Sequence, residues 1–205
     1  MNDQYYTADP HSESRPVPCA FPYRGYGLNF MTDAGVFSKG ELDVGTRLLL
    51  DALPALSGDV LDLGCGWGAI GVAVARANKA ASVVMADVNH RALGLARDNC
   101  LRNGVTAEVI ESDGMRAVMG RRFDAIITNP PIRAGKQVIY QMFADAALSL
   151  NPGGALYLVI RKQQGAESCV KYLKTLFDSV EKLDKSGGFW VLKASEPKEG
   201  TSDEV

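Results

Sequence analysis

The chain has 205 residues, of which 46% are hydrophobic and 22% charged, a composition that suits one compact globular domain. Its formal net charge of −2 argues against a surface that is basic throughout and wraps nucleic acid, although it leaves room for a local basic patch. No apolar run is long enough to span a membrane, and the amino terminus lacks a signal-peptide pattern, so we expect a cytoplasmic protein without membrane association.

Residues 1–20 are polar and interrupted by three prolines, which predicts an extended arm. Residues 21–37 combine aromatic residues with turn residues, which is typical of a short hairpin or an ordered lid. Ser38 and Glu41 have the spacing of a capping box and predict a helix over 41–53. We expect a single domain over 21–195 and a flexible tail over 196–205, because the tail is charged and polar.

Strand and helix patterns alternate after residue 58, which predicts a doubly wound, mainly parallel α/β sheet with helices on both faces. The expected strands are Val60–Leu63, Ser82–Asp87, Ala107–Glu111, Phe123–Thr128, Ala155–Ile160, Val180–Leu183 and Phe189–Ala194. The expected helices are Ala69–Ala77, Asn89–Asn103, Val138–Leu150 and Ala166–Phe177.

A glycine-rich turn joins the first of these strands to the first helix. The turn contains Gly64, Cys65, Gly66 and Gly68, and glycines there would let the backbone approach a nucleotide-like ligand. Asp87 ends the next strand, where an acid suits a ribose diol. A glycine run alone is weak evidence, because many turns are rich in glycine.

The stretch Asn129-Pro130-Pro131-Ile132 follows the buried strand 123–128. Two prolines cannot continue a sheet, so the chain must leave it in a stiff, extended turn. This turn would hold the Asn129 amide and the Pro130 carbonyl at the carboxyl end of a strand, where ligands bind in open α/β sheets. Taken alone, the tetrapeptide also fits a simple end of a strand.

These motifs together resemble the class I methyltransferases that use S-adenosylmethionine. Asp62-Leu63-Gly64-Cys65-Gly66, Asp87, Asp113 and the Asn-Pro-Pro turn carry that resemblance. Further segments are similar to the catalytic domain of small-subunit (16S) ribosomal RNA guanine-N2 methyltransferases. They are Tyr5-Tyr6-Thr7, Arg24-Gly25, Leu28-Asn29-Phe30, Thr32 to Lys39 with its Gly-Val-Phe-Ser-Lys sequence, and Asp43-x-Gly45-Thr46.

The resemblance implies a Rossmann-like, mostly parallel seven-stranded sheet with a carboxyl-terminal antiparallel strand. It also implies S-adenosylmethionine as the methyl donor and assigns the residues that would bind it. Asp62 would hold the methionine ammonium above the turn formed by Gly64, Cys65, Gly66 and Gly68. Asp87 would accept the ribose hydroxyls with help from Asn89, Asp113 would accept from the adenine amino group, and Phe37 and Lys39 would contact the donor.

The catalytic residues expected from this resemblance are Asn129, Pro130, Pro131 and Ile132. Two oxygens, from the Asn129 side chain and the Pro130 carbonyl, would accept the hydrogens of an exocyclic amine and aim its lone pair at the methyl group. Many amino-methylating relatives carry an aromatic residue where this chain has Ile132. We therefore expect a stacking partner for the base from Trp190 or from the segment Tyr23–Phe37.

RNA, most of all ribosomal RNA, is the partner that the resemblance implies. A local basic rim would bind it, formed by Arg24, Lys39, Arg133, Lys136, Arg161 and Lys162. The better-known relatives carry an extra amino-terminal domain, so a different acceptor or a homodimer both stay open here. The four scattered cysteines and the two isolated histidines have no metal-ligand spacing, so we expect free thiols and no metal site.

Other functions remain open at this stage. Adenine N6 is the nearest alternative to guanine N2, and a protein glutamine amide also presents two N–H hydrogens. A dehydrogenase that uses NAD would explain the glycine turn but leaves Asn129-Pro130-Pro131 without a purpose. A non-catalytic RNA-binding module is the last alternative.

Overall fold

The computed structural model describes residues 13–198, and its centre is a seven-stranded sheet with the strand order β5-β4-β3-β6-β7-β9-β8. Strand β9 runs antiparallel to both of its neighbours, and the remaining pairs are parallel. This confirms the predicted fold class. The strands are β3 (Gly58–Leu63), β4 (Ala81–Asp87), β5 (Glu108–Glu111), β6 (Phe123–Thr128), β7 (Leu150–Arg161), β8 (Phe177–Ser186) and β9 (Phe189–Pro197).

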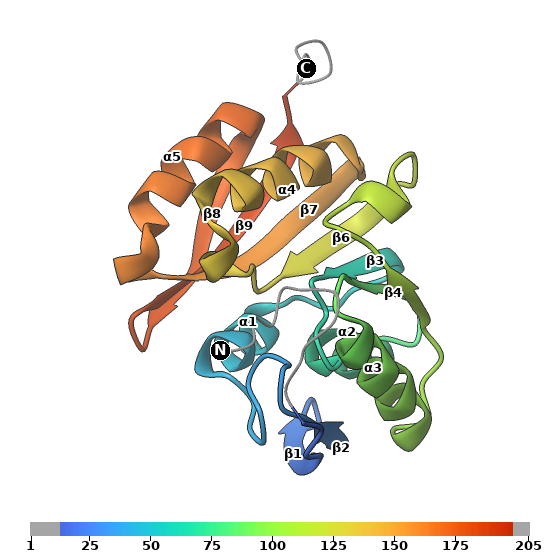
Figure 1. The fold of residues 1–205 in the computed structure, drawn as a ribbon. Helices are drawn as coiled ribbons and strands as arrows, with labels where there is room; N and C mark the ends of the chain where they lie inside the picture. The colour runs from blue at the N-terminus through green and yellow to red at the C-terminus, as the bar shows by residue number, and fades with distance from the viewer. Residues whose placement is uncertain (1–12, 199–205) are drawn as a thin grey trace.

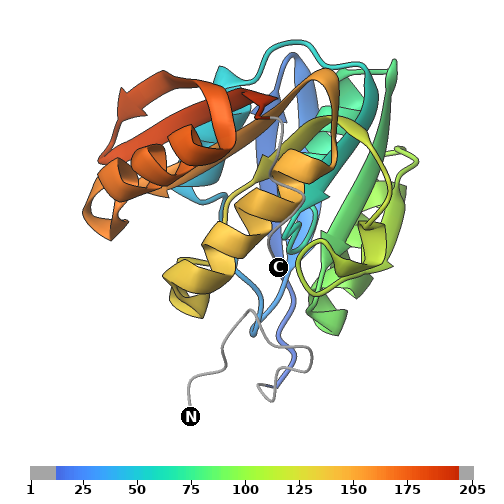
Figure 2. The ribbon, with the colours of Figure 1, turned by 90° about the horizontal axis from the view of Figure 1, so that it is seen from above.

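Helices cover both faces of this sheet (Figure 1). On one face lie α1 (Val44–Ala52), α2 (Ala69–Ala77) and α3 (His90–Arg102). On the other lie α4 (Lys136–Leu148) and α5 (Ala166–Leu176), which Figure 2 shows next to each other. None of the helices within residues 13–198 has the length and hydropathy that a membrane span requires.

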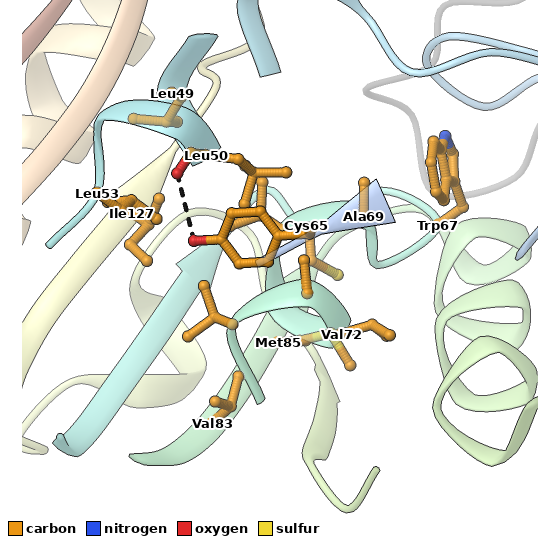
Figure 3. Packing of buried hydrophobic residues seen from close by; sticks show 14 of the residues in the cluster. Leu49, Leu50, Leu53, Cys65, Trp67, Ala69, Val72, Val83, Met85 and Ile127 are labelled. Atoms are coloured by element: carbon orange, nitrogen blue, oxygen red, sulfur yellow. Dashed lines mark hydrogen bonds between the residues drawn. The ribbon is translucent and has the colours of Figure 1, made fainter. Parts of the chain in front are cut away.

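The two faces of the sheet bury separate hydrophobic cores. Leu49 of α1 and Val72 of α2 pack with Val83 and Met85 of β4 on the first face (Figure 3). Each such side chain, fully removed from water, contributes about 1.5–3 kcal/mol to stability. The sheet, whose strand ends carry the site, is therefore packed against helices on both of its faces.

A separate hairpin, β1 (Val17–Tyr23) and β2 (Tyr26–Thr32), packs on α2 and α3. The buried side chain of Asn99 in α3 holds it in place. Its Oδ1 accepts from the Met31 backbone N–H at 2.8 Å, and its Nδ2 donates to the Met31 and Trp67 carbonyls at 2.9 and 2.8 Å. The expected hairpin exists, and it begins at Val17, inside the range expected for the arm.

The predicted start of the first helix is wrong. Helix α1 begins at Val44, and its N-cap is Asp43, whose carboxylate accepts from the Thr46 N–H at 3.0 Å. The Ser38 hydroxyl instead donates to the Glu41 carbonyl in a preceding turn. Aspartate caps helices as well as serine does, and the prediction from Ser38 and Glu41 did not consider Asp43.

The predicted end of the fourth helix is also wrong. Leu150 was expected on the apolar stripe of this helix, but it is the first residue of β7 and pairs with Phe123. Glu196 and Pro197 continue β9 beyond the expected limit of the domain. Residues 1–12 and 199–205, which include the Tyr5-Tyr6-Thr7 motif, lie outside the described residues.

The order of the strands brings two distant motifs together. Strand β3 pairs with β4 on one side and β6 on the other, with Asp62 opposite Ile127. The helices that follow these strands, α2 after β3 and α4 after β6, cover opposite faces, so a crevice opens at the carboxyl ends of β3 and β6. The glycine turn and the Asn-Pro-Pro turn both lie there.

Candidate active site

A cavity of about 620 Å³ occupies this crevice. Its walls come from the ends of β3, β4 and β6, from the loop after β5, and from the first turn of α1 and one face of α4. Of the residues expected at the site, those that line it are Phe37, Gly64, Cys65, Gly66, Asp87, Asp113, Asn129, Pro130 and Pro131.

The glycine turn has the backbone geometry that only glycine tolerates well. Gly64, Gly66 and Gly68 have φ values of 75°, 54° and 88°. A Cβ atom on Gly64 or Gly66 would meet no protein atom within 4 Å, so the backbone faces open space there. A Cβ on Gly68 would lie 3.3 Å from Ala96, so this glycine serves the packing of α2 against α3.

Asp62 lies at the end of β3 and is buried with one oxygen unused. Its Oδ2 accepts from the Gly71 N–H at 2.7 Å, whereas Oδ1 has no hydrogen-bond partner among the described residues. Burial raises the pKa of Asp62 to about 7; the Gly71 N–H lowers it, and the charge of Asp87 raises it further. A buried, unpartnered carboxylate oxygen is costly, and a cationic ligand group would relieve that cost.

Asp87 connects the glycine turn to the start of α3. Its Oδ2 accepts from the Gly66 N–H at 2.7 Å and its Oδ1 from the Asn89 N–H at 2.9 Å. Burial raises the pKa of Asp87, and the backbone N–H groups oppose that rise. Each oxygen keeps a lone pair that could accept from a ligand hydroxyl.

Asn89 does not line the cavity. Its side chain caps α3 by accepting from the Ala92 N–H at 2.9 Å, and its Nδ2 donates to the Gly35 carbonyl at 3.1 Å. Its position supports Asp87 and the loop around residue 35, and a direct ligand contact stays a prediction.

Asp113 is 65% exposed and pairs with Arg116 at 2.7 Å on the rim of the cavity.

Cys65 is buried inside the glycine turn, and burial raises the pKa of its thiol well above the ordinary value. The raised pKa describes a neutral thiol that lines the wall, not a reactive nucleophile.

The loop between β2 and α1 forms one side of the cavity. Phe37 lines it, and the Phe37 carbonyl accepts from Trp67 Nε1 at 2.9 Å, which fastens this loop to the glycine turn. Lys39 is exposed and does not line the cavity. Trp190 is only 5% exposed and lies away from the cavity, so the expectation that it stacks on a base is wrong. Phe37 is therefore the aromatic residue of the predicted segment that faces the site.

The Asn-Pro-Pro turn forms the wall opposite the glycine turn. The Asn129 side-chain Nδ2 donates to Thr46 Oγ1 at 2.9 Å and to Asp43 Oδ2 at 3.2 Å. Within the described residues, Asn129 Oδ1 accepts no hydrogen bond. Pro130 and Pro131 line the cavity, while Ile132 begins a short 3₁₀ turn outside it.

Residues of α1 and α4 also line the cavity, although the sequence did not single them out as site residues. Asp43 and Thr46 belong to the Asp43-x-Gly45-Thr46 motif, which carried the resemblance but received no role. On α4, the lining residues are Gln137, Val138, Gln141, Met142 and Asp145. The sequence could have pointed to this wall through the polar residues that alternate with the apolar stripe of α4. Polar residues in such positions usually face solvent, so they were not considered.

Residues 27–193 match the protein family described as Methyltransferase small domain. The chain belongs to this family. It is a class I methyltransferase that depends on S-adenosylmethionine, which confirms the resemblance seen in the sequence. The residues present are compatible with this donor. Asp62 keeps a buried, unpaired oxygen at the end of β3, although it does not itself line the cavity. Asp87 and the glycine turn do line the cavity, with open space beside Gly64 and Gly66.

Known proteins are similar to the chain over most of its length. It is 40% identical to the uncharacterized protein YbxB of Bacillus subtilis, over 95% of this chain and 98% of that protein. It is 35% identical to the ribosomal RNA small subunit methyltransferase C of Vibrio cholerae, over 75% of this chain but only 44% of that protein.

Among solved structures, the chain resembles the Thermus thermophilus 16S rRNA N2 G1207 methyltransferase, RsmC, in complex with AdoMet and guanosine. The TM-score is 0.80 at 29% identity, over 90% of this chain and 51% of that one. The chain thus spans about half the length of these two ribosomal RNA methyltransferases, at 44% and 51%, and nearly the whole of YbxB, at 98%.

Proposed function

We propose that the chain transfers a methyl group from S-adenosylmethionine to the exocyclic amine of an RNA base, with guanine N2 of ribosomal RNA as the acceptor. The observation that carries this proposal is the orientation of the Asn129 amide. Its nitrogen is engaged by Asp43 and Thr46, so its oxygen is left to accept a hydrogen bond beside the Pro130 carbonyl. The relatives named for ribosomal RNA methylation support the choice of acceptor.

The bound donor supplies a methyl group on a positively charged sulfur, which is already activated for transfer. The work of the chain is to present the acceptor nitrogen in line with that group. The Asn129 oxygen and the Pro130 carbonyl accept the two amino hydrogens, which draws the nitrogen lone pair out of conjugation with the base. The lone pair forms the new N–C bond, the S–C bond breaks with its electrons left on sulfur, and the surplus amino proton passes to water.

Donor binding falls to the opposite wall of the cavity. When S-adenosylmethionine is bound, Asp62 would accept from the methionine ammonium, Asp87 would accept from the ribose hydroxyls, and Asp113 would accept from the adenine amino group on the rim. Phe37 closes the site from the loop before α1 and offers a ring for stacking, which Ile132 cannot.

RNA would approach over the carboxyl edge of the sheet, where Arg133, Lys136, Arg161 and Lys162 follow β6 and β7. All four are exposed, and none belongs to an ion pair within residues 13–198. Lys185, beside the turn between β8 and β9, lies at the same edge. Arg24 does not belong to this rim, because it donates to the Leu53 and Pro54 carbonyls near the opposite end of β3.

The test is a single-turnover assay with methyl-labelled S-adenosylmethionine and unmodified small-subunit ribosomal RNA made by transcription. Asn129→Ala should lower the rate about 10²- to 10³-fold, because an acceptor aimed at the reacting group is lost. Its affinity for S-adenosylhomocysteine should stay within about twofold, since the donor wall is untouched.

Asn151→Ala is the matched control, because Asn151 binds Asp124 at the start of β7, on the opposite edge of the sheet. It should methylate RNA at the normal rate. Nucleoside digestion of the product should yield N2-methylguanosine. A normal rate for Asn129→Ala would overturn the proposed role of the turn, and label found in protein with inert RNA would favour a glutamine amide as the acceptor.

A further inference from the structure

The amide group of Asn129 can be held in two orientations that differ by a half-turn, and only one of them presents its oxygen to the cavity. Asp43, as a carboxylate, can only accept hydrogen bonds, and it lies 3.2 Å from Asn129 Nδ2. Thr46 Oγ1 lies 2.9 Å from the same nitrogen. The Thr46 hydroxyl can donate as well as accept, so Asp43, which can only accept, decides that Nδ2 faces α1 and that Oδ1 points away from it.

Both acceptors belong to the beginning of α1, since Asp43 is its N-cap and Thr46 lies in its first turn. Asp43 Oδ2 also accepts from the Thr46 N–H at 3.0 Å, so a single oxygen caps the helix and binds Asn129. Thr46 is only 5% exposed. A Cβ on Gly45 would lie 2.8 Å from the Phe189 ring and 2.9 Å from Asp43 Oδ2, so a side chain there would disturb the Asp43 carboxylate.

We propose that Asp43 and Thr46 are positioning residues that fix the orientation of the Asn129 amide for methyl transfer. This inference rests on the proposed role of Asn129. Without the two acceptors the amide can turn and present its N–H hydrogens to the amino group that it must hold, which replaces an attraction by a repulsion between donors. Asp43 and Thr46 are part of the cavity wall, and the role assigned to them is to act through Asn129.

The chain allows variants that remove the contact while they keep the helix. Thr46→Val has nearly the same shape and lacks the oxygen, whereas Thr46→Ser keeps it. Asp43→Ser keeps a good N-cap but is too short to reach Asn129. Thr46→Val and Asp43→Ser should each lower kcat for ribosomal RNA methylation about 10- to 100-fold, the range that follows from a misplaced reacting group.

Three readouts separate positioning from a merely structural role. Thr46→Ser should restore kcat to within about threefold of wild type, and KM and the affinity for S-adenosylhomocysteine should stay within about twofold in all variants. Thr46→Val should have no further effect in the Asn129→Ala background, since the two residues act as one unit. Normal turnover by Thr46→Val and Asp43→Ser, together with loss of turnover in Asn129→Ala, would overturn this inference and leave the proposed function intact.

A measurement without substrate tests the same contact directly. In the ¹H–¹⁵N spectrum the Asn129 side-chain NH₂ signals, identified by their loss in Asn129→Ala, should be shifted and slow to exchange in wild type and Thr46→Ser. They should move to the positions of a free amide when Thr46→Val and Asp43→Ser are combined. Unchanged signals in that double variant would show that neither residue holds the amide.

Discussion

Among the carboxylates of the proposed donor site, Asp62 has the most unusual surroundings. Its Oδ1 is buried and unpaired among the described residues, and burial raises its pKa to about 7. A raised pKa at this position is the expected sign of a carboxylate that waits for a cationic partner. The sequence predicted Asp62 as a site residue, but only burial reveals that one of its oxygens is left over.

Donor binding should therefore depend on pH near neutrality. In the proposed binding mode the ammonium pairs with the ionised form of Asp62, so lowering the pH from 8 to 6 protonates the carboxylate and should weaken S-adenosylhomocysteine binding about tenfold. Calorimetric titrations at several pH values measure this. Asp62→Asn should bind weakly with a flat profile, and a flat profile in the wild type would contradict the account.

The same shift has a consequence for stability. The folded pKa is about 7 and the ordinary value is 3.8, so between these values the folded protein holds a proton that the unfolded chain has lost. The contribution of Asp62 to the free energy of unfolding therefore falls as the pH rises through that window. Asp62→Asn should lessen this fall in melts of the protein without ligand.

At the scale of elements, the start of β7 illustrates how backbone packing limits what a sequence can predict. The register between β6 and β7 shifts between the pair Phe123–Leu150 and the pair Ala125–Ala155, which leaves Asn151–Gly154 as a bulge inside the strand. The Asn-Pro-Gly-Gly stretch predicted a break after a helix. It is instead a bulge, because Leu150 is already paired with Phe123.

Gly154 should tolerate no side chain in this bulge. A Cβ there would lie 2.9 Å from the carbonyl oxygens of Asn151 and Phe123 and 3.1 Å from that of Asp124, all of them backbone atoms. Gly154→Ala should lower the free energy of unfolding by about 1–3 kcal/mol, because these atoms cannot move without breaking the sheet. Urea denaturation measures the change.

Gly94 is the matched control for that substitution. It lies exposed inside α3, and a Cβ there would meet nothing within 4 Å. Gly94→Ala should raise the free energy of unfolding by about 0.5–1 kcal/mol, since alanine favours the helix. Equal effects of the two substitutions would mean that the crowding at Gly154 does not limit stability.

Local patterns predicted most elements well, and they failed where two local solutions competed. Helix α2 has the predicted bounds Ala69–Ala77, because the glycine turn and the apolar run leave only one choice. The start of α1 was missed, because both Ser38 and Asp43 could cap it and only packing against Asn129 and Phe189 selects Asp43. Helix propensity carries no information about the contact between Asp43 and Asn129.

At the scale of the whole molecule, the net charge hides local groups of cations. The net charge is −2, yet Arg133, Lys136 and Lys162 stand exposed at the carboxyl edge of the sheet, where the cavity opens. A weakly acidic protein can bind RNA through such a patch, since only the phosphates near the site need to be neutralised. The rule that ligands bind at this edge led to the rim expected from the sequence. Arg133, Lys136, Arg161 and Lys162 follow β6 and β7 at that edge, whereas Arg24 does not, and RNA binding there stays a prediction.

Replacing Arg133, Lys136 and Lys162 by glutamine should weaken RNA binding. The slope of log K against log salt should become shallower by about 0.7 for each lost phosphate contact, while donor affinity stays unchanged. Filter binding over a range of salt concentrations measures the slope. Lys79→Gln with Arg102→Gln, at the opposite edge, should leave it as in wild type, and an equal loss in both sets would mean that binding is not directed to this edge.

The sequence could not predict hydrogen bonds between residues that lie far apart along the chain. Asn99 joins the β1–β2 hairpin to the glycine turn through three hydrogen bonds, although Met31 and Asn99 lie 68 residues apart. A buried asparagine in a helix looks in sequence like any polar residue. The adjacency of β3 and β6, by contrast, follows from the rules of doubly wound sheets, and so did the meeting of the two site motifs.

The proposed function requires that a pair of oxygens at the Asn129-Pro130 turn holds an amino group beside the sulfur-bound methyl group of the donor. A crystal structure with bound S-adenosylhomocysteine tests this most directly. We predict that the sulfur faces Asn129 Oδ1 and the Pro130 carbonyl across open space wide enough for a base, with the ammonium on Asp62. A sulfur turned away from that turn, or a turn closed off by the protein, would contradict the account.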